Sequence, residues 1–190
     1  KYVMEDMNGR IEAVIDGGEA IIGLESTIVD LTSKVPMILR PGYITKDMLE
    51  DVLGLVDEDK TMMQGDTGEK PKAPGMKYRH YAPKGQLTII AGDSKKVVQR
   101  INELTDAMSV CGKKIGVIAT SENRSFYHAD VVKDAGSRED EATIAKELYR
   151  ILREFDDEDV EVIYSESFHG DGIGQAIMNR LLKAAGHHIE

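Results

Sequence analysis

The chain has 190 residues and 41% of them are hydrophobic, so it can bury a core and is too apolar to be disordered. Its formal net charge of −10 argues against a broad basic face for nucleic acid, so we expect no stable direct binding of nucleic acid. The single cysteine, Cys111, excludes an internal disulfide framework and fits a reducing, cytoplasmic compartment. No apolar run approaches the roughly 20 residues that cross a membrane, so no membrane partner is expected.

Residues 1–55 predict short strands followed by a helix. Apolar runs that end at turn signals indicate strands over 11–16, 21–31 and 37–40. The helix should begin after Thr45, whose hydroxyl can cap it, and should end at Gly54. So few strands bury too little surface to be stable alone, so we expect them to be the C-terminal part of a larger domain whose beginning is absent.

Residues 56–86 show no periodicity and hold three of the five prolines. Between positions 70 and 84 there are five cationic residues and no acid, together with Tyr78, His80 and Tyr81. A basic, aromatic, proline-stiffened segment between two folded regions suggests a lid over an anionic small molecule. The open alternative is a surface linker whose tyrosines pack on one of the domains.

Residues 87–190 alternate strands with helices. Strands are predicted over 87–91, 115–119, 129–132 and 160–164. Helices are predicted near 94–108, through a long segment from Ile144 to Phe155, and over 174–185. This alternation is typical of a small, open parallel sheet with helices on its faces, which is a Rossmann-like arrangement. The predicted fold class is therefore α/β.

Polar residues beside the strands are candidates for a binding site. Ser26 and Thr27 supply a hydroxyl pair, and Arg40 places a guanidinium that matches phosphate at a sharp turn. The alternatives are polar side chains on an edge strand and an ordinary surface arginine. The glycine-rich run 169–176 could expose N–H groups to an anion at a helix start, or it could be a tight turn. The four acids at 156–159 are more typical of a solvated loop than of a metal site.

Three sequence motifs occur in a fixed order: ESTIVDL at 25–31, ILRPG at 38–42 and APGMKYRHYAP at 73–83. In this order they resemble the two-domain threonylcarbamoyl-AMP synthases, in which a YrdC-type catalytic domain precedes a C-terminal domain. The resemblance extends to 9–11, 16–18 and 179–185, and so it spans nearly the whole chain. It implies the C-terminal part of a YrdC-like twisted α/β sheet at 1–55, a linker or lid over the active site at 56–86, and a Rossmann-like domain at 87–190.

The resemblance also implies a nucleotidyltransferase that makes threonylcarbamoyl-AMP and pyrophosphate from L-threonine, bicarbonate and ATP. The product feeds the formation of threonylcarbamoyladenosine in tRNA, which implies a downstream tRNA-modifying transferase complex as a partner. Mg²⁺ is expected to accompany ATP, although the sequence shows no dedicated metal site. Carried over by position, L-threonine would contact Ser26 and Thr27, and ATP would contact Arg40, Tyr78, His80 and Tyr81. The resemblance assigns no catalytic base.

Two motifs that grip the triphosphate in this family, Lys-x-Arg and Ser-x-Asn, lie upstream of the region that this chain resembles. We therefore expect the chain to be inactive by itself. Two interpretations from other functional classes stay open. The chain could be an RNA-binding module that uses its basic segment, or a regulatory nucleotide-binding module without catalysis. A steep salt dependence of RNA affinity would favour the first.

Overall fold

A computed structural model describes residues 1–62 and 82–190 of the chain. Its larger sheet has four parallel strands in the order β4-β7-β5-β6. They are β4 (Gln86–Ile90), β5 (Ile115–Ala119), β6 (Val131–Asp134) and β7 (Val162–Glu166). This arrangement confirms the predicted parallel sheet and the α/β fold class.

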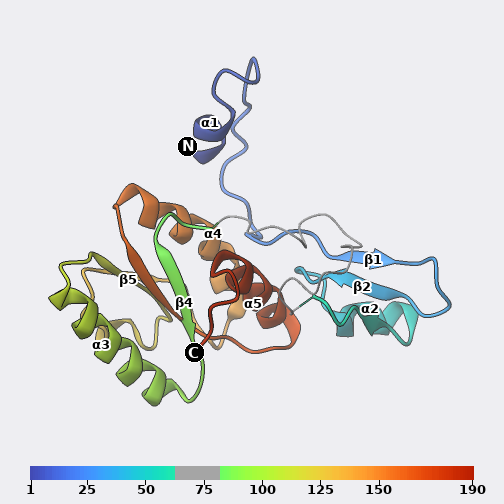
Figure 1. The fold of residues 1–190 in the computed structure, drawn as a ribbon. Helices are drawn as coiled ribbons and strands as arrows, with labels where there is room; N and C mark the ends of the chain where they lie inside the picture. Colours follow the sequence, from blue (N-terminus) through green and yellow to red (C-terminus); the bar gives the residue numbers. More distant parts are fainter. Residues whose placement is uncertain (63–81) are drawn as a thin grey trace.

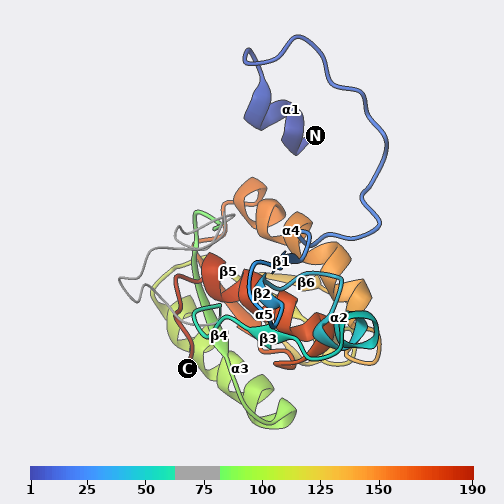
Figure 2. The same cartoon turned by 90° about the vertical axis from the view of Figure 1, so that its right-hand side faces the viewer.

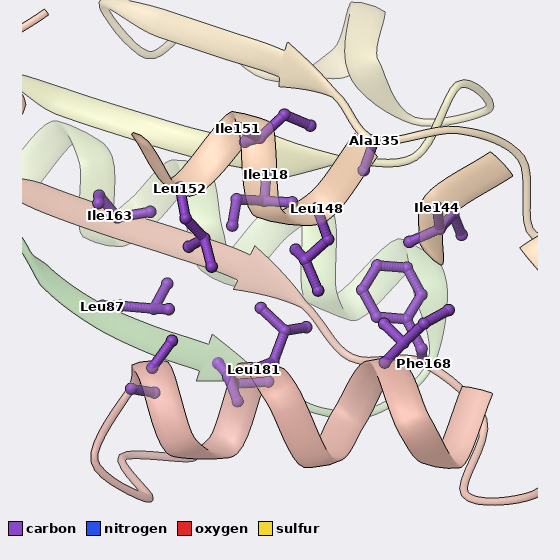
Figure 3. Close-up of a cluster of buried hydrophobic side chains, with 14 of the residues drawn as sticks. Leu87, Ile118, Ala135, Ile144, Leu148, Ile151, Leu152, Ile163, Phe168 and Leu181 are labelled. Atoms are coloured by element: carbon purple, nitrogen blue, oxygen red, sulfur yellow. The ribbon is translucent and has the colours of Figure 1, made fainter. Parts of the chain in front are cut away.

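Helices cover both faces of this sheet (Figure 1). One face carries α3 (Ser94–Val110), and the other carries α4 (Glu141–Asp157) and α5 (Gly172–Ala184), which pack on each other. A short 3-10 helix, η1 (Arg124–Phe126), joins β5 to β6. The apolar stripe predicted for α4 is buried against the sheet, as Figure 3 shows for Ile144, Leu148, Ile151 and Leu152. Among the helices that the structure describes, none is long and apolar enough to span a membrane.

Two strands start later than the sequence pattern predicts. The pattern places β7 at 160–164, but the Val160 N–H bonds the Phe155 carbonyl at 3.0 Å and so still belongs to the end of α4. Asp159 makes that turn with a φ of 51°. The pattern places β6 at 129–132, where Asp130 instead accepts the Ile115 N–H at 2.8 Å. Helix-capping and turn contacts therefore shorten both strands at their starts.

A smaller sheet is built from the N-terminal part of the chain. Its strands are β1 (Ile28–Asp30), β2 (Met37–Arg40) and β3 (Asp57–Glu58), with β2 antiparallel to β1 and parallel to β3. Between β2 and β3 lies α2 (Lys46–Leu53), which has the predicted Thr45 cap and the predicted end at Gly54. Ile38, Val56 and Met62 form a small core under it. The two-residue strand β3 lies within 56–86 and is too short to leave a periodic pattern in the sequence.

The N-terminal expectations need two corrections. The predicted strand over 11–16 does not form, and the one over 21–31 is reduced to β1. These residues instead form an irregular arm that leads from α1 (Tyr2–Met7) to β1, and Ile15 on it is 96% exposed (Figure 2). A strand needs a neighbour to complete its ladder, and none of the described residues pairs with this arm. The six-residue helix α1, which was not predicted, is held to α4 by ion pairs to Asp157 and Arg153.

Candidate functional site

The candidate site lies where the residues before β1 meet the end of β2. The pairing of these strands sets Ile28 opposite Arg40, so Ser26 and Thr27 lie beside the last residue of β2. The structure therefore brings three of the predicted site residues together: Ser26, Thr27 and Arg40. Helix α5 lies between this small sheet and the larger one, and it closes the site from the side of the larger sheet (Figure 1).

The guanidinium of Arg40 holds Ser26 by two oxygens. Its Nε and Nη2 donate to the Ser26 carbonyl at 3.0 and 2.8 Å, and Nη2 also donates to the Ser26 hydroxyl oxygen at 3.1 Å. The planar fork of an arginine suits this two-point contact, which a lysine could not reproduce. The contact with Arg40 fixes the Ser26 hydroxyl in place. Because Ser26 is exposed, this hydroxyl is still open to a ligand.

The turn at Pro41-Gly42 brings β2 and the β1 approach into direct contact. Both residues are buried, and the Cα of Gly42 packs on the backbone of residues 25–27. This packing explains why a glycine follows the proline in the LRPG motif. Thr27 has a structural contact as well, since its hydroxyl donates to the Ile44 carbonyl at 2.7 Å. Thr27 therefore joins the β1 approach to the start of α2.

The acid next to Ser26, Glu25, lies near Arg180 and Lys183, and Lys183 in turn lies near Arg40. Glu25 forms an ion pair with Arg180 of α5, whose side chain is only 5% exposed. Burial lowers the pKa of Lys183 on the same helix; nearby Glu25 raises it, while Arg40 and Arg180 lower it further. One carboxylate among Arg40, Arg180 and Lys183 leaves an excess of positive charge. Such a site favours an anionic ligand.

An open depression of about 560 Å³ adjoins this charged group. Among the described residues, its lining comes from the start of α1, the N-terminal arm, α4 and Arg180 of α5; it includes Glu25 but neither Ser26 nor Arg40. Its volume is in the range of small-molecule sites. The Ser26 hydroxyl and the Arg40 guanidinium are therefore not part of this lining, which includes their neighbour Glu25.

The predicted nucleotide contacts Tyr78, His80 and Tyr81 lie outside the described residues. Both flanks of their segment are anchored on helices that cover the larger sheet. Before it, Asn179 of α5 donates to the Met62 carbonyl at 2.5 Å; after it, the Lys84 N–H donates to Asp156 at 2.6 Å. Met62 and Pro83 are also buried. The two ends of the segment are thus set by α5 and α4.

A buried polar cluster at the carboxyl edge of the larger sheet was missed by sequence reasoning. Glu166, which ends β7, is fully buried and accepts hydrogen bonds from the Thr120 N–H at 2.9 Å, Asn123 at 2.9 Å and Arg138 at 2.7 Å. Tyr127 packs nearby. The pKa of its hydroxyl is raised mainly by burial and secondly by the negative charge of Glu166. The signal in the sequence was an acid that closes an apolar strand. Arg138 balances the charge of Glu166, and the donors join the β5–η1 and β6–α4 connections to the end of β7.

The glycine-rich run 169–176 is a tight turn into α5. The carboxylate of Glu141 lies beside Gly174 at the start of that helix, and His169 Nδ1 contacts Glu141 Oε1 at 3.0 Å. A carboxylate of the chain itself therefore already lies at the start of this helix, where the helix dipole favours negative charge. Three acids of 156–159 likewise bind the chain's own groups, from Lys84, Lys1 and Lys133. The described residues hold no cluster of three or more metal-ligating side chains.

Two known protein families match consecutive parts of the chain. Residues 44–186 match the family described as "Threonylcarbamoyl-AMP synthase, C-terminal domain", and residues 1–42 match the family described as "Telomere recombination". The two matches meet between Gly42 and Ile44, directly after the LRPG motif.

Curated relatives match over nearly the whole chain. The threonylcarbamoyl-AMP synthase of Bacillus subtilis is 43% identical over 100% of this chain and 53% of its own length. That of Pyrococcus abyssi is 42% identical over 99% of this chain and 53% of its own length. That of Schizosaccharomyces pombe is 32% identical over 97% and 48%, respectively. The chain therefore spans about half the length of the curated relatives it matches.

Two solved structures are also similar to nearly the whole chain. The Pyrococcus abyssi Sua5 protein in complex with L-threonine is 41% identical, with a TM-score of 0.88 over 98% of this chain and 53% of that protein. A variant of the same protein, in which an adjacent histidine and tyrosine are replaced by alanine, gives a TM-score of 0.88 at 40% identity over 98% and 52%.

Proposed function

Because the chain belongs to the threonylcarbamoyl-AMP synthase family, we propose that it is part of an enzyme that makes threonylcarbamoyl-AMP and pyrophosphate from L-threonine, bicarbonate and ATP. The product would supply the formation of threonylcarbamoyladenosine in tRNA, in the cytoplasm, and a downstream tRNA-modifying transferase complex would consume it. The activity belongs to an extended protein, by which we mean this chain preceded by an upstream region like that of its relatives.

The contact of Arg40 with Ser26 carries the proposal. It presents an exposed hydroxyl of fixed position beside an excess of positive charge. L-threonine, which carries a carboxylate, an ammonium and a hydroxyl group, offers matching partners, and Ser26 with its neighbour Thr27 is the proposed contact. The Pyrococcus abyssi relative, which was solved with L-threonine, supports a threonine site in this family.

ATP is proposed to bind on the Arg40 side of the site, with Tyr78, His80 and Tyr81 reaching it from residues 56–86. A histidine is directly followed by a tyrosine at one place in the sequence, His80-Tyr81. In the Pyrococcus abyssi variant a histidine and the tyrosine that follows it were replaced by alanine, which supports a functional role for His80 and Tyr81. Mg²⁺ would arrive with ATP as part of the nucleotide substrate. Lys183 and Arg180 would add to the positive field that favours the phosphates.

The proposed chemistry needs positioning more than covalent catalysis. The amino group of L-threonine first attacks the carbon of bicarbonate, so that a carbon–nitrogen bond replaces a carbon–oxygen bond and water leaves; an oxygen of the resulting carbamate then attacks the α-phosphorus of ATP. The new oxygen–phosphorus bond replaces the bond to the β-phosphate, and pyrophosphate leaves. Holding both substrates in line and neutralising the phosphates supplies most of the rate in such transfers. Ser26 would orient threonine, and Arg40 would fix Ser26 and face the nucleotide.

The test is release of pyrophosphate from ATP by the extended protein, with each substrate omitted in turn. Turnover should require both L-threonine and bicarbonate, and Ser26→Ala should weaken it. The present chain alone, under the same conditions, is expected to be inactive. Hydrolysis of ATP at the same rate without L-threonine would contradict the proposed function.

A further inference from the structure

One face of α5 is committed to the small sheet rather than to its own domain. Gln175 donates to the Glu58 carboxylate at 2.7 Å, Asn179 donates to the Met62 carbonyl, and Arg180 binds Glu25. A spacing of four residues places Gln175 and Asn179 on the same side of the helix, and Arg180, about 100° further around, borders that side. A single helix of the larger domain therefore holds the small sheet at β3, just after β3, and just before β1.

Arg180 is the contact nearest to the proposed threonine site. Its side chain is 5% exposed, and its guanidinium carbon lies 5.8 Å from the centre of the Tyr149 ring on α4, which limits the positions open to the charge. Glu25 is more open, with 34% of its side chain exposed. A buried arginine is tolerated only with a partner, and removing either member leaves an uncompensated charge. The pair therefore fixes the backbone at Glu25 against α5.

Glu25 directly precedes Ser26, which Arg40 grips from the opposite side. The short segment 25–27 is consequently held at four points: by Arg180 on α5, by Arg40 on β2, by the close packing of Gly42, and by the bond from the Thr27 hydroxyl to the Ile44 carbonyl. Three of these contacts come from the part of the chain that builds the small sheet. The contact with Arg180 comes from a helix of the larger sheet, whose carboxyl-edge cluster around Glu166 lies on other loops.

We propose that Arg180 is a positioning residue for the proposed threonine site, and that it acts through Glu25 to set the place of the Ser26 hydroxyl. This inference rests on the proposed function for its substrate. It gives the larger domain a specific task, which is to fix one wall of the binding site from α5. Arg180 need not touch the reacting atoms to do so.

The first test measures hydrogen exchange in the present chain. In Arg180→Met, peptides covering residues 25–31 should exchange faster than in the parent chain, whereas peptides from β5 and β7 should not change. Arg150→Met is the matched control, because Arg150 is an ion-paired arginine of α4 whose partners, Glu147 and Glu154, lie on the same helix. Unchanged exchange at 25–31 in a folded Arg180→Met chain would overturn the proposal.

The second test measures kinetics in the extended protein. Arg180→Met should raise the KM for L-threonine, by up to roughly a hundredfold for a misplaced binding group, and raise the KM for ATP by less. Glu25→Gln should have a similar effect, and the double variant should cost no more than the larger single one, because the two residues act as a unit. Arg180→Lys, which keeps the charge, should recover part of the loss.

If Arg180→Met does not fold, Arg180→Lys and Glu25→Gln carry the same comparison. A KM for L-threonine within twofold of the parent value in these folded variants, or strictly additive effects, would show that the pair is merely structural. If the parent extended protein does not consume L-threonine at all, the proposed function fails. Hydrogen exchange at 25–31 then decides alone whether Arg180 positions this segment.

Discussion

A β-carbon placed on Gly42 would lie 2.4 Å from the carbonyl oxygen of Glu25 and 2.5 Å from the Thr27 nitrogen. Both atoms belong to the backbone, so neither can rotate away. The glycine of the LRPG motif is therefore required by the close approach of two chain segments, the same two that Arg40 and Ser26 join.

Gly42→Ala should separate these segments. Overpacking of this kind costs about 1–3 kcal/mol, and the melting temperature should fall by several degrees. In the extended protein, affinity for L-threonine should fall with it. Gly17→Ala is the control, because a β-carbon there would meet nothing within 4 Å. Calorimetry and threonine titration check both variants; equal behaviour of the two would contradict the packing argument.

Arg40→Lys in the extended protein should separate two roles of this residue. Lysine keeps the positive charge but loses the fork that holds the Ser26 carbonyl and hydroxyl. We expect L-threonine affinity to fall roughly tenfold to a hundredfold, since a charge-assisted hydrogen bond contributes about 1.5–3 kcal/mol. ATP affinity should fall less than it does in Arg40→Ala. Titration calorimetry with each substrate gives the comparison. Unchanged L-threonine affinity in Arg40→Lys would show that the Arg40–Ser26 hydrogen bonds do not determine binding.

Lys183 should reduce stability at neutral pH in a way that fades in alkali. Burial lowers its pKa in the folded chain below the usual value of about 10.4. The unfolded chain therefore binds more protons between the lowered pKa and 10.4, and stability rises with pH across that window. Lys183→Met should be more stable than the parent below the window and lose this advantage as pH rises through it. Denaturant unfolding at several pH values checks this, with the exposed Lys96 changed to Met as the control.

Glu166→Gln should destabilise the larger domain. The carboxylate accepts from Thr120, Asn123 and Arg138, so an amide would turn one donor group towards other donors and would leave the arginine without its counter-charge. The loss should be about 3–5 kcal/mol. Glu161→Gln, at an exposed carboxylate paired with Lys113, should have little effect on the melting temperature. Equal melting temperatures for the two variants would mean that the cluster is not a unit.

Local patterns predicted the helices α2 and α4 well. The spacing of Ile144, Leu148 and Phe155 fixes the buried face of α4, and Thr45 and Gly54 mark the two ends of α2, because caps and amphipathic faces depend on residues close in sequence. The arm at 11–27 could not be predicted in the same way. Its apolar residues read as strands, but strand formation depends on a neighbour, and none of the described residues supplies one.

The same distinction applies to the site. Ser26 and Arg40 were identified from motifs, and the structure brings them into contact. Glu25 with Arg180, and Glu166 with Arg138, join residues distant in sequence. Pairs of this kind leave only a weak local sign, which is a single charge within an otherwise apolar helix or strand. The three-dimensional structure was needed to show which charged side chains form ion pairs with each other.

The last prediction concerns residues 77–81, whose flanks are anchored by Asn179 and Asp156. In the extended protein, ATP with L-threonine should slow hydrogen exchange at 75–82, because the proposed contacts of Tyr78, His80 and Tyr81 would close over the nucleotide. Pro74 and Pro83 should limit the entropy lost on closing.

Replacing 77–81 by glycine and serine should cut turnover and also increase hydrolysis of the adenylate, since water would no longer be excluded. Replacing an equal number of residues at 64–68 is the control, because that stretch carries neither aromatic residues nor lysines or arginines. Exchange mass spectrometry and product analysis give the two readouts. If exchange at 75–82 is the same with and without substrates, and the replaced protein turns over normally, residues 77–81 serve only to connect the two sheets.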